Sequence, residues 1–233
     1  MPLADRSVLI TGATGGLGRV ATAAFARTGA RLGLGGTDSG RLAALAAELE
    51  LADGRWQPLV ADLRRPEEAR AIVEQFGPVD VAIHAVGGWA GGTPVVELDH
   101  DEIRAMLDQH LWTTLNVVQA VVPGMVERRW GRVIGMSSPF AVEPGPKGAS
   151  YAVAKAAEEI VLRSLAREVA AAGVTVNILA ARTIDAAHER EREPSARNAA
   201  WTTPEEIVAP MLFLASDEAG AITGARIRLD RRA

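Results

Sequence analysis

Short apolar runs alternate with longer helix-type segments along the whole chain. The runs are rich in β-branched and aliphatic residues and predict strands, whereas the longer segments are rich in Ala, Leu, Glu and Arg and predict helices. The predicted strands are Ser7–Thr11, Ala30–Gly35, Arg55–Val60, Val79–His84, Arg132–Met136, Val174–Leu179 and Arg226–Leu229. The predicted helices are Leu17–Thr28, Arg41–Leu51, Glu67–Phe76, Asp101–Arg128, Tyr151–Ala172 and Pro204–Ala215.

The connections between these elements are short and marked by glycine. Gly29, Gly54, Gly77 and Gly173 each follow a predicted helix and precede a predicted strand. Alternating strands and helices with such connections are typical of a parallel sheet covered on both faces. We therefore expect an α/β fold: one doubly wound Rossmann-like domain over residues 1–233, with a mostly parallel seven-stranded sheet in the order 3-2-1-4-5-6 and an extra final strand. No linker, repeat or break in composition divides the chain.

Composition and charge exclude or disfavour several classes of site and partner. The chain has 233 residues and no Cys, which excludes disulfides, thiolate metal sites and a cysteine nucleophile. Its net charge of −4 argues against a nucleic-acid partner, and the absence of an apolar run of about 20 residues argues against a membrane span. The four His are scattered, so no metal is expected. A cytoplasmic protein is the default expectation.

The turn after the first strand carries the first chemical signal. Gly12, Gly15, Gly16 and Gly18 lie where this strand ends and the first helix begins. Bare backbone lets a pyrophosphate approach the amides at a helix N-terminus, where the helix dipole favours an anion. An ordinary tight turn would use glycine as well. The position in the first βα unit favours a dinucleotide site.

The choice between NAD and NADP stays open at the end of the second strand. A Rossmann site places there an acid for the ribose hydroxyls or a base for a 2′-phosphate. Asp38 comes one or two residues later than expected and could instead cap the helix that follows. Thr37 or Arg41 could serve a phosphate.

Several motifs occur in a fixed order along the chain. The glycine turn is followed by Asp62 after the third strand, by Ser138, and by Tyr151-Ala-Val-Ala-Lys155 thirteen positions later. The chain thereby resembles the short-chain dehydrogenase/reductase family over essentially its whole length. Taken singly, Tyr151 could merely pack, Lys155 could be a solvated surface lysine, and Ser138 could be a turn residue. The joint spacing favours catalysis.

The resemblance implies an NAD(P)-dependent enzyme that interconverts a carbonyl and a secondary alcohol by hydride transfer. Tyr151 would donate or accept the proton, Ser138 would polarise the carbonyl, and Lys155 would lower the pKa of the phenol and hold the nicotinamide ribose. The cofactor-binding residues implied are Gly12, Thr14, Gly15, Gly16, Leu17, Gly18, Thr37, Asp62, Leu63, Ala85, Val86, Gly87, Tyr151, Lys155 and Ile184. The substrate would be a small molecule, and the assembly a homodimer or homotetramer.

Several positions depart from the family pattern, among them a family Thr that aligns with Ala186. Its Asn-Asn-Ala-Gly appears as His84-Ala-Val-Gly87, and the helix Asn of its proton relay aligns with His110. His110 could replace that Asn through a water, because imidazole donates, accepts and titrates near pH 6.5, or it could be a packed helix histidine. A Pro-Gly after the sixth strand appears as Ala181-Arg182, and the closing Asp-Gly-Gly as Asp230-Arg-Arg232.

Two alternatives follow from these features. The segment 87–92, with Trp89, resembles the dihydropteridine reductase branch of the family, and Trp112 and Trp201 are also reminiscent of it. Trp side chains gathered near the carbonyl site could stack on a flat heteroaromatic substrate. The departures also allow a nucleotide-binding sensor or scaffold with weakened catalysis. The mixed-charge run 188–193 is expected to be a solvated surface, and Glu158 and Glu159 are taken as polar interruptions of an apolar helix.

Overall fold

Seven parallel strands form one sheet in the order β3-β2-β1-β4-β5-β6-β7, which confirms the predicted topology. The computed structural model describes residues 3–229, so the departure at residues 230–232 lies outside the described residues. Each predicted strand is present within a few residues of its expected bounds. The strands are β1 (Ser7–Thr11), β2 (Arg31–Gly36), β3 (Trp56–Val60), β4 (Val81–His84), β5 (Gly131–Ser137), β6 (Val174–Ala180) and β7 (Arg226–Arg228).

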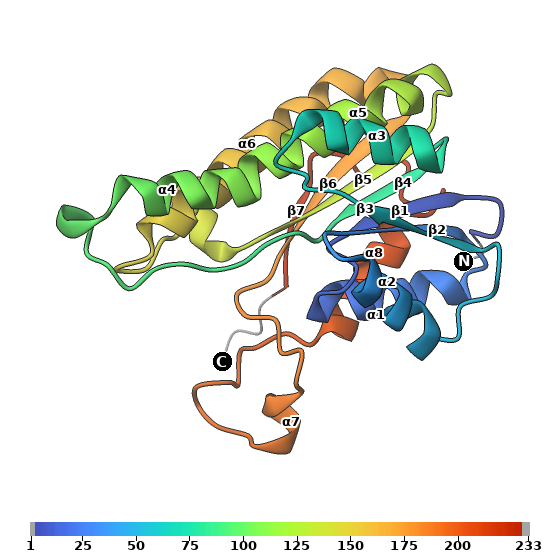
Figure 1. Ribbon diagram of the computed structural model, residues 1–233. Helices are drawn as coiled ribbons and strands as arrows, with labels where there is room; N and C mark the ends of the chain where they lie inside the picture. The colour runs from blue at the N-terminus through green and yellow to red at the C-terminus, as the bar shows by residue number, and fades with distance from the viewer. Residues whose placement is uncertain (1–2, 230–233) are drawn as a thin grey trace.

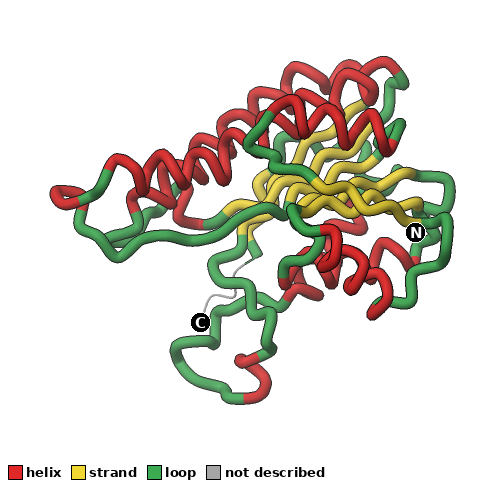
Figure 2. The backbone as a smooth tube through the Cα atoms, in the orientation of Figure 1, coloured by secondary structure: helices red, strands yellow, loops and turns green. Residues whose placement is uncertain are grey.

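Helices cover both faces of this sheet, as Figures 1 and 2 show. In Figure 1, α3, α5 and α6 lie above the sheet and α1, α2 and α8 below it. The helices are α1 (Gly16–Arg27), α2 (Ser39–Glu48), α3 (Pro66–Phe76), α4 (His100–Leu107), α5 (Thr113–Glu127), α6 (Ala149–Val169), α7 (Glu189–Arg192) and α8 (Pro204–Leu214). Short turns η1 (Val95–Glu97), η2 (Asp108–Trp112), η3 (Pro139–Ala141) and η4 (Ala170–Ala172) complete the elements.

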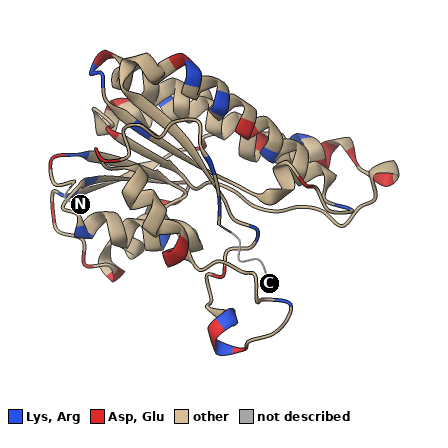
Figure 3. Ribbon diagram, turned by 180° about the vertical axis from the view of Figure 1, so that it is seen from behind, with Lys and Arg blue, Asp and Glu red and all other residues tan. Residues whose placement is uncertain are grey.

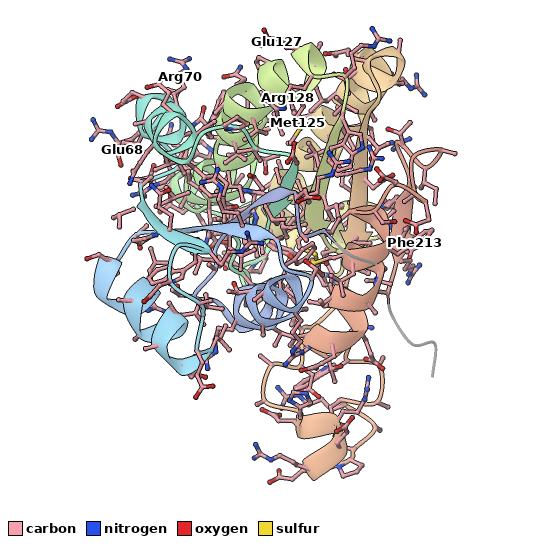
Figure 4. All side chains as sticks on the ribbon, turned by 90° about the vertical axis from the view of Figure 1, so that its right-hand side faces the viewer. Glu68, Arg70, Met125, Glu127, Arg128 and Phe213 are labelled. Atoms are coloured by element: carbon pink, nitrogen blue, oxygen red, sulfur yellow. The ribbon has the colours of Figure 1, made fainter. Side chains whose placement is uncertain are left out.

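Each face of the sheet has its own apolar core. Helix α3 illustrates how the sequence pattern builds one of them: Ala69 and Ile72 are buried, whereas the side chain of Arg70 points away from the molecule (Figure 4). Every residue of β4 and β6 is buried, as central strands of a sheet with two covered faces require. The site is therefore built on a rigid, doubly packed scaffold.

Three predicted helices differ in detail from the structure. The predicted helix Arg41–Leu51 starts at Ser39, after its Asp38 cap, and ends at Glu48. The segment predicted as one helix, Asp101–Arg128, starts at His100 and contains a π-helical turn, η2, between α4 and α5. The predicted helix Tyr151–Ala172 starts two residues earlier, at Ala149, and its last three residues form the 3-10 turn η4. The apolar positions on both sides of the π turn still follow a helical spacing. The pattern therefore predicts one continuous helix and does not reveal the turn.

The sheet order places a crevice at the carboxyl ends of the strands. The chain runs outward in one direction from β1 to β2 and β3, and in the other from β1 to β4, β5 and β6. The loops after β1 and β4 therefore diverge, and ligands of open α/β sheets bind at such a point. The glycine turn follows β1, residues 85–87 follow β4, and Ser138 follows β5, so all three segments meet at this edge.

Candidate active site

The glycine turn is packed too closely for side chains at three of its positions, Gly12, Gly16 and Gly18. Gly12 has a φ of +73°, and a Cβ there would lie 2.7 Å from the Ala85 carbonyl oxygen. A Cβ on Gly18 would overlap the carbonyl oxygen of Gly12. The turn is closed by the Gly15 amide, which donates to the Gly12 carbonyl at 3.0 Å. This geometry exposes the backbone at the start of α1, as anion binding requires.

Two adjoining cavities, of about 640 and 550 Å3, share Gly15, Ala85, Val86 and Gly87 in their linings. Because they share these lining residues, the two cavities form one cleft across the crevice. Every residue expected to bind the cofactor lines one cavity or both. The 550 Å3 cavity includes Gly12, Thr14, Thr37, Asp62 and Leu63, and the 640 Å3 cavity includes Gly16, Leu17, Gly18, Tyr151, Lys155 and Ile184.

The acid next to the second strand is used to cap a helix. Asp38 Oδ1 accepts from the Arg41 amide at 2.9 Å and so forms the N-cap of α2, and Asp38 does not line the cleft. Thr37 and Arg41 do line it. Asp62 also lines the cleft, and its carboxylate accepts from Arg64 Nε and Nη2 at 2.8 and 2.7 Å. The Arg64 guanidinium thereby holds the pKa of Asp62 below its usual range.

Ser138 follows β5 and is buried at the catalytic end of the cleft. Its Oγ accepts from the Phe140 amide at 3.3 Å, as the cap of η3. A hydroxyl that accepts one bond still has its own hydrogen to donate. Ser138 can therefore donate to an oxygen in the cavity without losing the contact that orients it.

Tyr151 stands in the first turn of α6, and its ring is held between two others. The ring centroids of His110 and Phe140 lie 5.5 and 6.2 Å from that of Tyr151, both in edge arrangements. Lys155 follows one helical turn later, and both side chains line the 640 Å3 cavity together with Ser138. The structure thus brings the three expected catalytic side chains to one cavity.

Lys155 has an acidic partner that the sequence analysis did not place in the site. Its Nζ donates to the Met136 carbonyl and to Glu158 Oε2, each at 2.8 Å. The exposed fractions of the Lys155 and Glu158 side chains are 5% and 1%, so this is a buried ion pair. Burial raises the pKa of Glu158, and the Lys155 ammonium opposes that shift. Glu158 is therefore part of the site's electrostatics and not merely a polar interruption of α6.

His110 is buried in the π turn η2 and faces the same cavity. Its Nε2 lies 3.0 Å from the Gly88 carbonyl oxygen, which can only accept, so Nε2 carries the proton and Nδ1 is left as an acceptor. Nδ1 is buried without a hydrogen-bond partner. Burial, with the nearby Lys155 charge, lowers the pKa of His110 to about 3. A π turn is common at functional sites, and here it directs a neutral imidazole at the catalytic cavity.

His84, the other histidine that departs from the family pattern, serves the scaffold. It lies between Thr11 and Thr113: its Nδ1 is 2.8 Å from Thr11 Oγ1 and its Nε2 is 3.2 Å from Thr113 Oγ1. Thr113 Oγ1 also donates to the Gln109 carbonyl, so it accepts from His84 Nε2. Burial lowers the pKa of His84 to about 3, which keeps the ring neutral. His84 thereby ties β1 and β4 to α5.

The segment after β6 folds over the glycine turn. A backbone bridge joins Ile184 to Thr202 at its base, and Asp185 accepts from the amides of Glu189 and Arg190 at the start of α7. Its tip carries the mixed charges expected of a solvated surface (Figure 3). A Cβ on Gly16 would lie 2.6 Å from the Cβ of Ala186, so this segment contacts the turn directly.

The expected gathering of tryptophans at the carbonyl site is wrong. Trp89 lines the 640 Å3 cavity and is 63% exposed. Trp112 is half-exposed on η2 outside that lining, and Trp201 lines a separate hollow beside α7. The three residues come from loops and turns whose separation the sequence does not reveal. One exposed ring does not form the two-sided stack that a flat heteroaromatic substrate would favour.

Within residues 3–229, no group of three or more His, Asp or Glu side chains is arranged to hold a metal ion. Over the same residues, none of the helices is both long and apolar enough to cross a lipid bilayer.

A model of the short chain dehydrogenase family matches residues 6–197, which include the glycine turn and all the catalytic candidates. The chain belongs to the short-chain dehydrogenase/reductase family. It is an NAD(P)-dependent oxidoreductase of that family. The short-chain dehydrogenase fold also agrees with the crevice and the strand order described above.

Similar proteins align with most of the chain, and some with nearly all of it. The 3-oxoacyl-(acyl-carrier-protein) reductase of Thermotoga maritima is 29% identical over 242 aligned positions, which cover 99% of this chain and 98% of that one. The 1-deoxy-11-beta-hydroxypentalenate dehydrogenase of Streptomyces exfoliatus is 31% identical over 191 positions, covering 79% and 70%. A solved structure of a 3-oxoacyl-(acyl-carrier protein) reductase with bound NAD from Brucella melitensis has a TM-score of 0.85 at 27% identity, covering 97% and 89%.

Two acidic residues of the site were missed from the sequence. Glu158 lies three positions after Lys155, and this spacing places two side chains on one face of a helix. The spacing alone could therefore have indicated an ion pair with Lys155. Glu159 is also buried, and both of its carboxylate oxygens lie 2.9 Å from Arg226 Nε on β7. No spacing rule connects residues 67 positions apart, so that contact required the fold.

Proposed function

We propose that this chain reduces a ketone to a secondary alcohol, with Tyr151 as the proton donor. The observation that carries the proposal is the convergence of Ser138, Tyr151 and Lys155 on one cavity that continues into the glycine turn. The three side chains have the chemistry that the reaction needs. Ser138 offers a hydroxyl donor to the developing negative charge, Tyr151 a phenol that supplies the proton, and Lys155 a cation that stabilises the resulting phenolate. The placement of each on a helix or strand end favours the fixed geometry that this chemistry needs.

The roles follow the charge that develops during reduction. When bound, the nicotinamide supplies a hydride to the carbonyl carbon. Ser138 donates a hydrogen bond to the carbonyl oxygen as it becomes negative, and the Tyr151 hydroxyl transfers its proton to that oxygen. Lys155 then stabilises the phenolate. His110 stays neutral with a pKa of about 3, so we assign it an accepting role at Nδ1, in place of the family's Asn, and not a titrating one.

We infer a preference for NADPH over NADH. The open glycine backbone and the cleft on both sides of it fit a dinucleotide, with Asp62 and Leu63 at the adenine end and Lys155 and Ile184 at the nicotinamide end. At the end of β2, Asp38 is engaged as a helix cap, whereas Thr37 and Arg41 face the cleft. A cation and a hydroxyl suit a 2′-phosphate better than a bare ribose hydroxyl.

A 3-oxoacyl thioester is the substrate class we propose. It is the class named for the Thermotoga relative, and the side chains around the reacting end of the cavity include the apolar groups of Phe140, Ile184 and Trp89. The test follows NADPH oxidation with acetoacetyl-coenzyme A, a plain cyclic ketone and a quinonoid dihydropterin. Turnover of the thioester with the highest kcat/KM supports the proposal. A higher kcat/KM with either of the other substrates would reassign the class.

We also propose that the chain forms a homo-oligomer. Val153 and Ile160 lie seven positions apart on α6, on one helix face, and are 48% and 63% exposed. Light scattering coupled to size exclusion gives the mass in solution. A mass of two or four chains is expected, and a monomer would contradict the proposal.

A further inference from the structure

Glu158 is an acid buried beside the lysine of the catalytic set. Its Oε2 accepts from Lys155 Nζ at 2.8 Å, and its Oε1 accepts from Thr114 Oγ1 at 3.2 Å. The side chain is 1% exposed, so water does not solvate its charge. A buried carboxyl is costly unless it is compensated, which makes its position next to this particular cation significant.

Titratable groups near the Glu158–Lys155 pair include His110, His84 and Glu159. His110 Nδ1 approaches Oε2 to 3.9 Å from η2. Burial and the Lys155 charge lower the pKa of His84 on β4 to about 3, and the pKa of His110 is also about 3, so both imidazoles are neutral. Glu159, the next residue of α6, has its own partner in Arg226. Lys155 is therefore the positive group at hydrogen-bond distance from Glu158.

We propose that Glu158 offsets the charge of Lys155, so that Tyr151 keeps its proton and the site is held in the form that donates to a carbonyl. The inference rests on the proposed role of Tyr151. The pair carries no net charge whether the shared proton sits on Lys155 Nζ, as ammonium and carboxylate, or on Glu158 Oε2, as amine and carboxylic acid. Glu158 is a positioning residue: it acts on Tyr151 only through Lys155.

The physical argument compares a compensated cation with a lone one. A positive charge within a few ångströms stabilises a phenolate, and it does so strongly where water is excluded. A carboxylate bound to that cation opposes part of this stabilisation. With Glu158 in place, the phenolate of Tyr151 forms at higher pH than it would beside an unpaired ammonium. At a given pH, more of the enzyme then holds the phenol that reduction consumes, and less holds the phenolate from which alcohol oxidation begins.

The chain offers a direct measurement, because Tyr151 is its single tyrosine. The ultraviolet difference absorbance of tyrosinate against pH therefore reports this one residue, and Tyr151→Phe must abolish the signal. Glu158→Gln and Glu158→Leu remove the charge and should lower the midpoint by on the order of one pH unit. Glu158→Asp keeps the charge and should restore a midpoint near that of the wild type. A midpoint that is unchanged or higher in the folded uncharged variants overturns the proposal.

Two controls make the result specific. Glu168→Gln is the same substitution on the same helix, at an exposed residue that bonds Ser164, and it should leave the midpoint unchanged. If the single variants lack the wild-type circular dichroism, the double variant Lys155→Met/Glu158→Gln leaves no charge to bury. It should titrate within about half a pH unit of the wild type, whereas a rise of about one unit or more would show Lys155 acting as an uncompensated cation.

The titration needs neither substrate nor cofactor, so its outcome is separate from that of the proposed function. A chain that fails to reduce any ketone in the panel can still show the shift, and a chain that reduces ketones can still lack it. In an active enzyme a second readout applies: Glu158→Gln should move the pH profile of kcat for alcohol oxidation toward acid by the same amount.

Discussion

Arg226 Nε lies 2.9 Å from both carboxylate oxygens of Glu159, and the Nη2 of the same guanidinium donates to the Ser138 carbonyl at 2.9 Å. The last strand, the catalytic helix α6 and the loop that carries Ser138 are thus fixed to one another through one side chain. Glu159 is 4% exposed and Arg226 is 21% exposed, so removal of the arginine leaves a buried carboxylate without its cation.

Arg226→Met should therefore destabilise the protein and reduce turnover. We expect a loss of about 2–3 kcal/mol in the free energy of unfolding, measured with urea, because an unpaired buried charge remains. The double variant Arg226→Met/Glu159→Gln should recover part of this loss, since no lone charge is left. An additive double variant would show that the pair is not coupled. A lower kcat in the folded single variant would reflect displacement of Ser138.

Arg41 provides the test of cofactor preference. Its side chain lines the adenine half of the cleft beside Thr37, so Arg41→Ala should weaken NADPH binding and leave NADH binding unchanged. The loss of one charged contact to a phosphate corresponds to roughly tenfold in Kd. Quenching of tryptophan fluorescence measures both affinities. Arg65→Ala is the matched control, because Arg65 is exposed, pairs with Glu67 and lies outside the lining. Wild-type protein that binds NADH more tightly would contradict the inference.

His84 should make the protein sensitive to acid. Burial lowers the pKa of His84 from 6.5 to about 3 in the folded chain. Between these two pH values the imidazole is therefore protonated in the unfolded chain and neutral in the folded chain. The free energy of unfolding therefore falls as the pH drops through this window, by up to about 1.4 kcal/mol per pH unit for this residue.

His84→Asn should flatten this dependence, because an amide can still bond Thr11 and Thr113 and does not titrate between pH 3 and 6.5. Urea unfolding at about pH 6.5 and about pH 5 should show the wild type losing roughly 2 kcal/mol more than the variant. His100→Asn, at an exposed position, should behave as the wild type does. Equal slopes in the wild type and His84→Asn would mean that the folded chain protonates His84 readily.

The sequence was sufficient for the sheet order and for the local parts of the site. The glycine turn, the strand-end position of Ser138 and the single helical turn from Tyr151 to Lys155 depend on local spacing, which periodicity and turn chemistry reveal. Asp38 could be interpreted as a cap for the same reason, and it is one. These features needed no knowledge of distant contacts.

The electrostatic surroundings of the site could not be predicted in the same way. Arg226 contacts Glu159 and Ser138 only because β7 adds to the sheet next to β6. The burial of Glu158 depends on η2 and α5 packing against α6. The π turn at His110 is hidden in a nearly regular helical pattern. The distribution of the tryptophans likewise depends on where loops end in space.

Tyr151→Phe tests the central claim most directly. The substitution removes one oxygen and keeps the ring that contacts His110 and Phe140, so the fold and the cleft should be unchanged. The account predicts that NADPH still binds with wild-type affinity by fluorescence quenching, while kcat for ketone reduction falls by about 10²–10⁴-fold. Turnover that persists at the wild-type rate with the cofactor bound would show that another group supplies the proton.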